Sequence, residues 1–183
     1  MHIRLATTDD AAAVAAIYAP FVVDTAISFE TVPPDASEMA ARIGSKLPRF
    51  PWLVAEQEAE IIGYSYAGAH RERAAYAWSV EVSAYVAPSA RRRGVATKLY
   101  ETLLELLREQ GFRMAYAGIT LPNPASVGFH EAMGFIPLGV YRNVGWKFDQ
   151  WHDVGWWELP LGDGSPAAPI KTLDELETWP IIP

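Results

Sequence analysis

The fold of this 183-residue chain is decided by the stretch Tyr85-Val86-Ala87-Pro88-Ser89-Ala90-Arg91-Arg92-Arg93-Gly94-Val95-Ala96-Thr97. An alternating run that ends at Val86 predicts a strand, Pro88 predicts a turn, and a helical spacing of leucines begins after Gly94. A helix N-terminus attracts anions because its first amides lack partners and its dipole is positive there, and glycine lets a phosphate approach the backbone. We therefore expect an anion-binding turn here, to which the three arginines add charge; a solvated basic turn is the alternative.

Strand and helix patterns extend outward from this stretch over most of the chain. The residues before it predict a strand over 76–86 whose alternation places Glu81 on the face opposite Val80 and Val82. Other periodic runs predict strands at 2–6, 52–56, 61–69, 112–121, 135–148 and 152–159, and helices at 35–46, at 125–133, from 11 to Pro20 and from 95 until Gly111. We expect one α+β domain over residues 1–160 and a C-terminal tail over residues 161–183, with a helical turn at 173–177.

Composition argues against several classes of function. Fifteen Lys and Arg against 22 Asp and Glu give a net charge of −7, so we expect no nucleic-acid partner. The absence of cysteine excludes disulfide scaffolds, Cys-ligated metals and thiol nucleophiles, and it favours a cytoplasmic location. The apolar run from Ala11 to Val23 is broken by Pro20, so it predicts neither a membrane span nor a signal peptide. We also expect no metal cofactor.

A second motif lies downstream, where Asn123, Ser126, Phe129-His130-Glu131 and Gly134-Phe135 follow one another at fixed spacing. This motif and Arg91-x-x-Gly94-x-Ala96 together resemble two conserved segments of the GNAT superfamily of acyl-CoA N-acyltransferases. The resemblance implies the GNAT fold, with a mixed central sheet flanked by helices. It also implies acetyl-CoA as the cosubstrate.

Within that superfamily, the chain is similar to phosphinothricin acetyltransferases and their methionine-sulfoximine-acetylating relatives from about Ile3 to Leu159. The segments that carry this similarity are Ile17-Tyr18, Ser28-Phe29-Glu30, residues 63–68, Trp78-x-x-Glu81-x-Ser83-x-Tyr85-Val86, Leu121-Pro122-Asn123, His130-Glu131 and residues 151–155. The resemblance implies direct transfer of the acetyl group from acetyl-CoA to the amino group of a small amino-acid-like acceptor. It also implies a homodimer.

The same resemblance assigns two catalytic candidates. Glu81 lies on the strand where the family carries its proposed general base, and its alternative role is an ion pair with Arg71, Arg73 or Lys147. His130 occupies the position where many GNAT enzymes have a tyrosine as the proposed acid. We expect it to protonate the departing thiolate or to contact the acceptor, whereas a merely packed histidine is the alternative.

Cofactor contacts are implied along the central strand and the turn after it. The backbone of Ala84, Tyr85 and Val86 should hold the pantetheine arm like an added strand. The pyrophosphate should bind at Arg91, Arg92, Arg93, Gly94, Val95, Ala96 and Thr97. Asn123 and Ser126 should lie near the thiol, with a helix cap and an ordinary surface residue as the respective alternatives.

The acceptor pocket is implied at Phe29 and Glu30 and at Arg71, Arg73 and Tyr76. Arginine binds carboxylates and related anions in bidentate fashion, so the two arginines favour an anionic acceptor. A charged surface turn is the alternative for Arg71 and Arg73. Two other functions stay open: acetylation of a different amine, such as a peptide N-terminus or a polyamine, and acyl-CoA sensing without catalysis.

Overall fold

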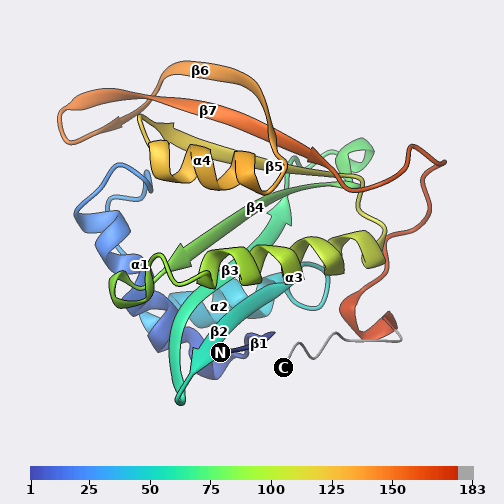
Figure 1. Cartoon of the computed structure of the whole chain (residues 1–183), viewed down its shortest axis with the longest axis horizontal. Coiled ribbons are helices and arrows are strands. Elements are labelled where there is room, and N and C mark those ends of the chain that lie inside the picture. The colour runs from blue at the N-terminus through green and yellow to red at the C-terminus, as the bar shows by residue number, and fades with distance from the viewer. Residues whose placement is uncertain (177–183) are drawn as a thin grey trace.

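A seven-stranded sheet in the order β1-β2-β3-β4-β5-β7-β6 runs through the molecule (Figure 1). The computed structural model describes residues 1–176. All neighbouring strands are antiparallel except β4 and β5, which are parallel, so the sheet is mixed. The strands are β1 (His2–Leu5), β2 (Trp52–Gln57), β3 (Glu60–Ala69), β4 (Ser79–Val86), β5 (Met114–Leu121), β6 (Ile136–Lys147) and β7 (Gln150–Pro160).

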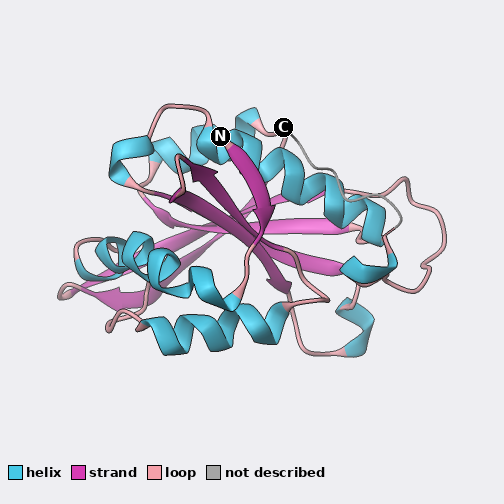
Figure 2. Cartoon of the chain, turned by 90° about the horizontal axis from the view of Figure 1, so that it is seen from below, coloured by secondary structure: helices cyan, strands magenta, loops and turns pink. Residues whose placement is uncertain are grey.

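Helices cover both faces of the sheet (Figure 2). The α-helices are α1 (Ala11–Val23), α2 (Ala36–Lys46), α3 (Val95–Gln110) and α4 (Pro124–Ala132), and short 3-10 turns form at Thr8–Asp10, Ala74–Tyr76, Pro88–Ala90 and Leu173–Glu175. Side chains of α3 and α4 join one apolar cluster, and side chains of α1 and α2 join another on the opposite side. The prediction of an α+β fold with a mixed sheet flanked by helices is confirmed.

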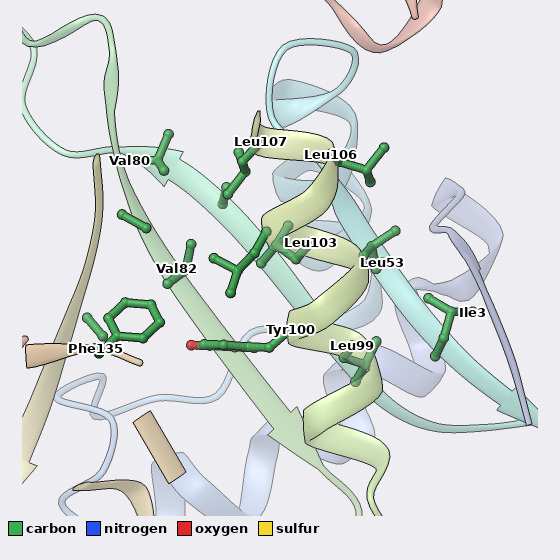
Figure 3. Packing of buried hydrophobic residues seen from close by; sticks show 14 of the residues in the cluster. Ile3, Leu53, Val80, Val82, Leu99, Tyr100, Leu103, Leu106, Leu107 and Phe135 are labelled. Atoms are coloured by element: carbon green, nitrogen blue, oxygen red, sulfur yellow. The ribbon is translucent and has the colours of Figure 1, made fainter. Parts of the chain in front are cut away.

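The larger cluster is built on the leucine stripe of α3. Leu99, Leu103 and Leu107 recur at intervals of four residues, which keeps them on one helix face, and all three are fully buried. They pack against Val80 and Val82 of β4, as Figure 3 shows. Burial of each such side chain contributes about 1.5–3 kcal/mol, so this helix fixes the position of β4 firmly.

Two predicted boundaries are wrong. Helix α1 continues through Pro20 to Val23, because Pro20 lies on the exposed side while Val22 is buried and the Asp24 amide donates to the Pro20 carbonyl at 2.9 Å. Strand β4 begins at Ser79 rather than at Tyr76, since residues 74–76 close a 3-10 turn instead of pairing with a neighbouring strand. The predicted face alternation of β4 is correct: Val80 and Val82 belong to the α3 cluster.

The segment after β7 packs back onto the domain. Leu161 and Leu173 are buried in the α3 cluster, and the Gln110 side chain donates to the Lys171 carbonyl at 2.8 Å. The predicted helical turn at 173–177 is a 3-10 turn over Leu173–Glu175, and Glu177 lies outside the described residues. Within residues 1–176, no helix combines the length and the apolar character that a membrane crossing needs.

Candidate active site

Strands β4 and β5 separate and open a cleft. They pair over only three residues, from Ser79 opposite Met114 to Glu81 opposite Tyr116, and then diverge (Figure 1). The opening is lined by Ile27, Val82, Ser83, Ala84, Tyr85, Tyr100, Gly118, Ile119, Thr120, Asn123, Ser126 and His130. Four of the residues expected to bind the cofactor, Ala84, Tyr85, Asn123 and Ser126, therefore meet at one place with the catalytic candidate His130.

The edge of β4 beside the cleft keeps its backbone open. Residues Ala84–Val86 pair with β3 on one side, whereas the structure records no β5 partner for them within residues 1–176. The Tyr85 side chain is anchored on the opposite face, where its ring meets those of Tyr18 and Phe21 edge to face at 4.9 and 5.0 Å. A ligand with amide groups can thus pair with this edge without displacing a side chain.

In the turn after β4, no side chain of the described residues caps the backbone amides at the start of α3. Arg92 and Gly94 both have positive φ, 59° and 78°, and the first turn of α3 has no side-chain cap. A Cβ atom at Gly94 would meet nothing within 4 Å, so the backbone there is open to an approaching group. Successive amides in such a turn make an anion-binding concavity at the positive end of the helix dipole.

The three arginines of that turn are exposed, and two of them make one side-chain contact each. The Arg91 guanidinium lies 5.4 Å from the Phe21 ring centroid, and Arg93 donates to the Gln57 side chain at 3.1 Å. Val95 is buried in the α3 cluster, Ala96 is half-buried and Thr97 is exposed. Of the residues expected to bind pyrophosphate, Val95 can therefore contribute only its backbone.

The far wall of the cleft is the first part of α4. Asn123 caps this helix, because its Oδ1 accepts from the Ser126 amide at 3.1 Å, and both residues also line the cleft. His130 is buried and places Nδ1 2.8 Å from the Ser126 carbonyl and Nε2 3.0 Å from the Tyr100 hydroxyl. A carbonyl only accepts, so Nδ1–H donates to it and Nε2 accepts from Tyr100. Burial lowers the pKa of His130, which favours this neutral form.

Tyr100 is a residue of the cleft that the sequence reasoning missed. Figure 3 shows its ring extending from α3 toward Phe135, and the residue is fully buried. Burial also raises its pKa, so the phenol keeps its proton. The available signal was a hydroxyl-bearing side chain next to Leu99 in an otherwise aliphatic stripe.

Glu81 lies where the cleft closes, as the last residue of β4 that pairs with β5. Its Oε1 is 3.0 Å from His70 Nδ1 and 3.6 Å from Arg71 Nη1, and its side chain is 38% exposed. The ion pair expected as the alternative role of Glu81 is thus present with Arg71. Lys147 is engaged elsewhere: its ammonium donates to the carbonyls of Val22, Ser28 and Glu30 at 2.6, 2.7 and 2.8 Å.

The residues expected to bind the acceptor fall into two groups. Arg71 and Tyr76 lie beside His70, and the Tyr76 ring meets the His70 ring edge to face at 6.1 Å. Arg73 is exposed on the same loop. On the other side of the site, the Phe29 ring packs on Gly145, where a Cβ atom would clash with it, and lies 6.1 Å from the His152 ring.

Glu30 does not present a free carboxylate. Arg42 donates to both of its oxygens at 2.8 and 2.9 Å, and Tyr18 donates to one of them at 2.9 Å. This pairing with Arg42 lowers the pKa of Glu30. The carboxylate therefore fixes the loop between α1 and α2, in which Phe29 lies.

Comparison with known proteins agrees with this geometry. Residues 3–156 match the family model described as "Acetyltransferase (GNAT) domain". Phosphinothricin N-acetyltransferase of Streptomyces viridochromogenes is 37% identical over 176 residues, covering 96% of each chain, and that of Alcaligenes faecalis is 40% identical, covering 91% of this chain and 86% of its own.

Solved structures show the same fold with a ligand of the expected class. A GNAT superfamily phosphinothricin acetyltransferase from Sinorhizobium meliloti, solved in complex with acetyl-CoA, superposes with a TM-score of 0.86 at 34% identity and covers 92% of each chain. Two signature segments, a cleft between splayed strands and a family match over most of the chain lead to one conclusion. The chain belongs to the GNAT family and is an acetyl-CoA-dependent N-acetyltransferase.

Proposed function

We propose that this enzyme transfers the acetyl group directly from acetyl-CoA to the amino group of a small amino-acid-like acceptor of the phosphinothricin or methionine sulfoximine type. One observation carries the proposal. Glu81 is the last residue of β4 that pairs with β5, and the cleft opens at the next residue, Val82. A proton-accepting group therefore lies at the apex of the cleft, where the acetyl group of a bound cofactor would end.

The cofactor binds along β4 and the turn after it. Its pantetheine amides pair with the open backbone of Ala84–Val86, and its pyrophosphate sits on the amides of residues 91–97, with the exposed arginines nearby. Asn123 and Ser126 face the thiol end from α4. An amide of β4 polarises the thioester carbonyl and stabilises the oxyanion that forms on it.

The reaction needs a neutral amine and a proton for the leaving thiolate. A free α-amino group has a pKa of about 7.7–8.0, so a modest base suffices, and we assign that role to Glu81 together with its hydrogen-bonded partner. The amine attacks the thioester carbonyl and the tetrahedral intermediate expels coenzyme A. In the Tyr100–His130 pair, which lines the cleft, the Tyr100 hydroxyl gives its proton to the thiolate, and the second N–H proton of the acetylated nitrogen replaces it.

The acceptor occupies the face of the sheet that carries Glu81. Arg71 and Arg73 bind its carboxylate or a second anionic group, and Tyr76 contributes an apolar wall. Phe29 closes the other side, and Glu30 contributes by holding that loop through Arg42. Glu30 thus supports the pocket without contacting the acceptor.

A thiol-release assay tests the proposed function. Acetyl-CoA is supplied with phosphinothricin, methionine sulfoximine, methionine sulfone, ordinary amino acids, a peptide and a polyamine in parallel. We expect free coenzyme A with at least one of the three amino-acid analogues, and a higher kcat/KM for it than for the peptide or polyamine. Release of coenzyme A with the polyamine alone would contradict an amino-acid-like acceptor and would indicate a cationic amine instead. Acetyl-CoA binding with no release across the panel would favour a sensor.

We also propose that the enzyme is a homodimer that pairs through β6. This strand is an edge of the sheet, and all of its residues from Ile136 to Val144 are exposed although many are apolar. The exposed large apolar side chains at this edge are Ile136, Leu138, Val140, Tyr141, Val144, Trp146, Phe148 and Trp151. An unpaired edge with apolar side chains on it is suited to a second copy of the chain.

Sedimentation velocity tests the dimer. Val140→Glu, on β6, is expected to shift the enzyme to monomer, whereas the matched change Val32→Glu, at a 75% exposed position elsewhere, should leave the dimer intact. A wild-type enzyme that sediments as a monomer at micromolar concentration would contradict the proposal.

A further inference from the structure

His70 lies beside Glu81 and is enclosed by aromatic side chains. Its ring stacks on Tyr116 with centroids 4.4 Å apart and meets Tyr76 and Trp156 edge to face at 6.1 and 6.2 Å. The His70 side chain is only 15% exposed. The surrounding rings hold the imidazole in one orientation.

The hydrogen bond to Glu81 fixes which nitrogen carries the proton. His70 Nδ1 lies 3.0 Å from Glu81 Oε1, and a carboxylate can only accept a hydrogen bond. The proton is therefore assigned to Nδ1, and in the neutral ring the lone pair is on Nε2. When Nε2 of such a histidine takes up a proton, the carboxylate on Nδ1 stabilises the imidazolium that forms.

The His70 ring also lines a cavity that Glu81 does not line. This cavity has a volume of about 250 Å³, and its walls are His70, Tyr116, Leu138, Gly139, Tyr141 and Trp156. It adjoins the cleft, because the Trp156 indole lies against Gly118, where a Cβ atom would be 3.3 Å from it, and Gly118 lines the cleft. An amine placed in this cavity would lie beside His70, which lines it, whereas Glu81 is not among the lining residues.

We propose that His70 Nε2 is the atom that takes the acceptor's proton, and that Glu81 is the carboxylate that orients and stabilises the ring. The N–H bond of the ammonium breaks and an H–Nε2 bond forms. The freed lone pair attacks the thioester carbon, and the C–S bond breaks as the departing thiolate takes a proton from the Tyr100–His130 pair. The second N–H proton of the tetrahedral intermediate replaces the proton that this pair gives up, and the imidazolium later returns its own proton to solvent. This inference rests on the proposed acetyl transfer and deepens it by naming the base.

Two amide substitutions separate this role from a purely structural one. In His70→Asn, the side-chain amide nitrogen occupies the position of Nδ1, so it still donates to Glu81 but the lone pair of Nε2 is lost. In His70→Gln, the amide reaches the Nε2 position and the bond to Glu81 is lost. We expect both to lower kcat by about 100-fold and to leave the Kd for acetyl-CoA within about twofold.

The pH dependence of kcat/KM provides the second readout. Wild-type enzyme should show an acid limb that His70→Asn removes, and the matched change His2→Asn, at an exposed position on β1, should keep both the limb and the rate. Other ionisable groups around His70 or its partner stay the same in both variants; they are Glu81, Arg71, Glu72, Arg73, Tyr76, Tyr116, Tyr141 and Lys46.

The outcomes are distinct. If His70→Asn keeps more than half of the wild-type kcat and its acid limb, Glu81 is the base and His70 only orients it, which overturns the inference. If the wild-type enzyme releases no coenzyme A with any acceptor, the proposed function itself fails. Loss of rate with loss of acetyl-CoA binding in both variants would show a collapsed site and would also count against the inference.

Discussion

Two arginine-bearing loops flank strand β4, and they serve the site in different ways. The loop before β4, residues 70–78, contains Arg71 and Arg73, and the loop after it, residues 87–94, contains Arg91–Arg93. In the first loop the side chains of His70 and Arg71 turn toward Glu81. In the second, the arginines stay exposed and the backbone opens at positive φ.

The cause of this difference is the pairing of β4. At its start the strand has neighbours on both sides, so the loop before it meets side chains of adjacent strands. At its end the strand has lost β5, so the loop after it faces open space that a ligand can enter. Two arginine-bearing loops with similar charges can therefore offer a ligand different groups. The loop before β4 offers charged side chains, and the loop after it offers backbone amides.

The largest effect is expected where the backbone itself is the binding surface. In the double change Arg91→Glu with Gly94→Glu, a side chain is forced onto a φ of 78° and negative charge is placed at a helix N-terminus. Isothermal titration calorimetry should then detect no acetyl-CoA binding. The matched change Gly164→Glu places the same side chain at a φ of 80° away from the cofactor turn, and it should leave acetyl-CoA binding intact. Retained binding in the double variant would remove this turn from the cofactor site.

A smaller effect is expected at the side chains of the first loop and its partner. Glu81→Gln keeps the shape of the carboxyl group but loses its charge, so kcat should fall by about 100-fold while the Kd for acetyl-CoA stays unchanged. Steady-state kinetics at saturating acetyl-CoA measures this. Glu60→Gln, an exposed position on β3, is the control. Unchanged turnover in Glu81→Gln would exclude the carboxylate from the mechanism.

A still smaller effect should separate the arginines of the two loops. Arg73→Ala is expected to raise the acceptor's KM about tenfold, through loss of a charged hydrogen bond, and to leave that of acetyl-CoA unaffected. Arg91→Ala should do the reverse. If both variants change the same KM, the two loops do not bind different ligands and the comparison fails.

The smallest effect concerns the stability of the fold and His130, in the α4 wall of the cleft. Burial lowers the pKa of His130, so the folded state disfavours its proton, whereas the unfolded chain binds one below the ordinary histidine pKa of about 6.5. The contribution of this group to the free energy of unfolding is complete above that pH and declines as the pH falls. Urea unfolding between pH 7.5 and 5 should therefore show a shallower decline in His130→Gln than in wild type or in His2→Gln. Equal slopes would show that His130 is not the group responsible.

The sequence predicted best what depends on local periodicity. The leucines of α3 and the alternation of Val80 and Val82 were placed correctly because one face of each element is buried. The end of α1 was predicted wrongly at Pro20. The helix continues because the proline is exposed and burial of Val22 outweighs the local cost of a proline inside the helix. The family resemblance, and not the spacing, pointed to acetyl-CoA.

Partners that are distant in the sequence could not be predicted in the same way. His70 meets Glu81 because Gly68 and Glu81 are opposite each other in the β3–β4 register, which no local pattern reveals. Tyr100 meets His130 across two helices separated by β5. Glu30, which the resemblance placed in the acceptor pocket, is paired with Arg42 of α2, and no local pattern reveals that contact.

The ammonium of Lys147 gives the molecule a mechanical connection between its outer edge and its acceptor side. Lys147 is the last residue of β6, and its ammonium donates to the carbonyls of Val22, Ser28 and Glu30, which lie on both sides of Phe29 in the chain. Separation of the carbonyls from the lysine would leave a buried ammonium without its hydrogen-bond partners, so the loop and the end of β6 are tied together. A displacement of the end of β6 is therefore expected to reach the loop that carries Phe29 through these three hydrogen bonds.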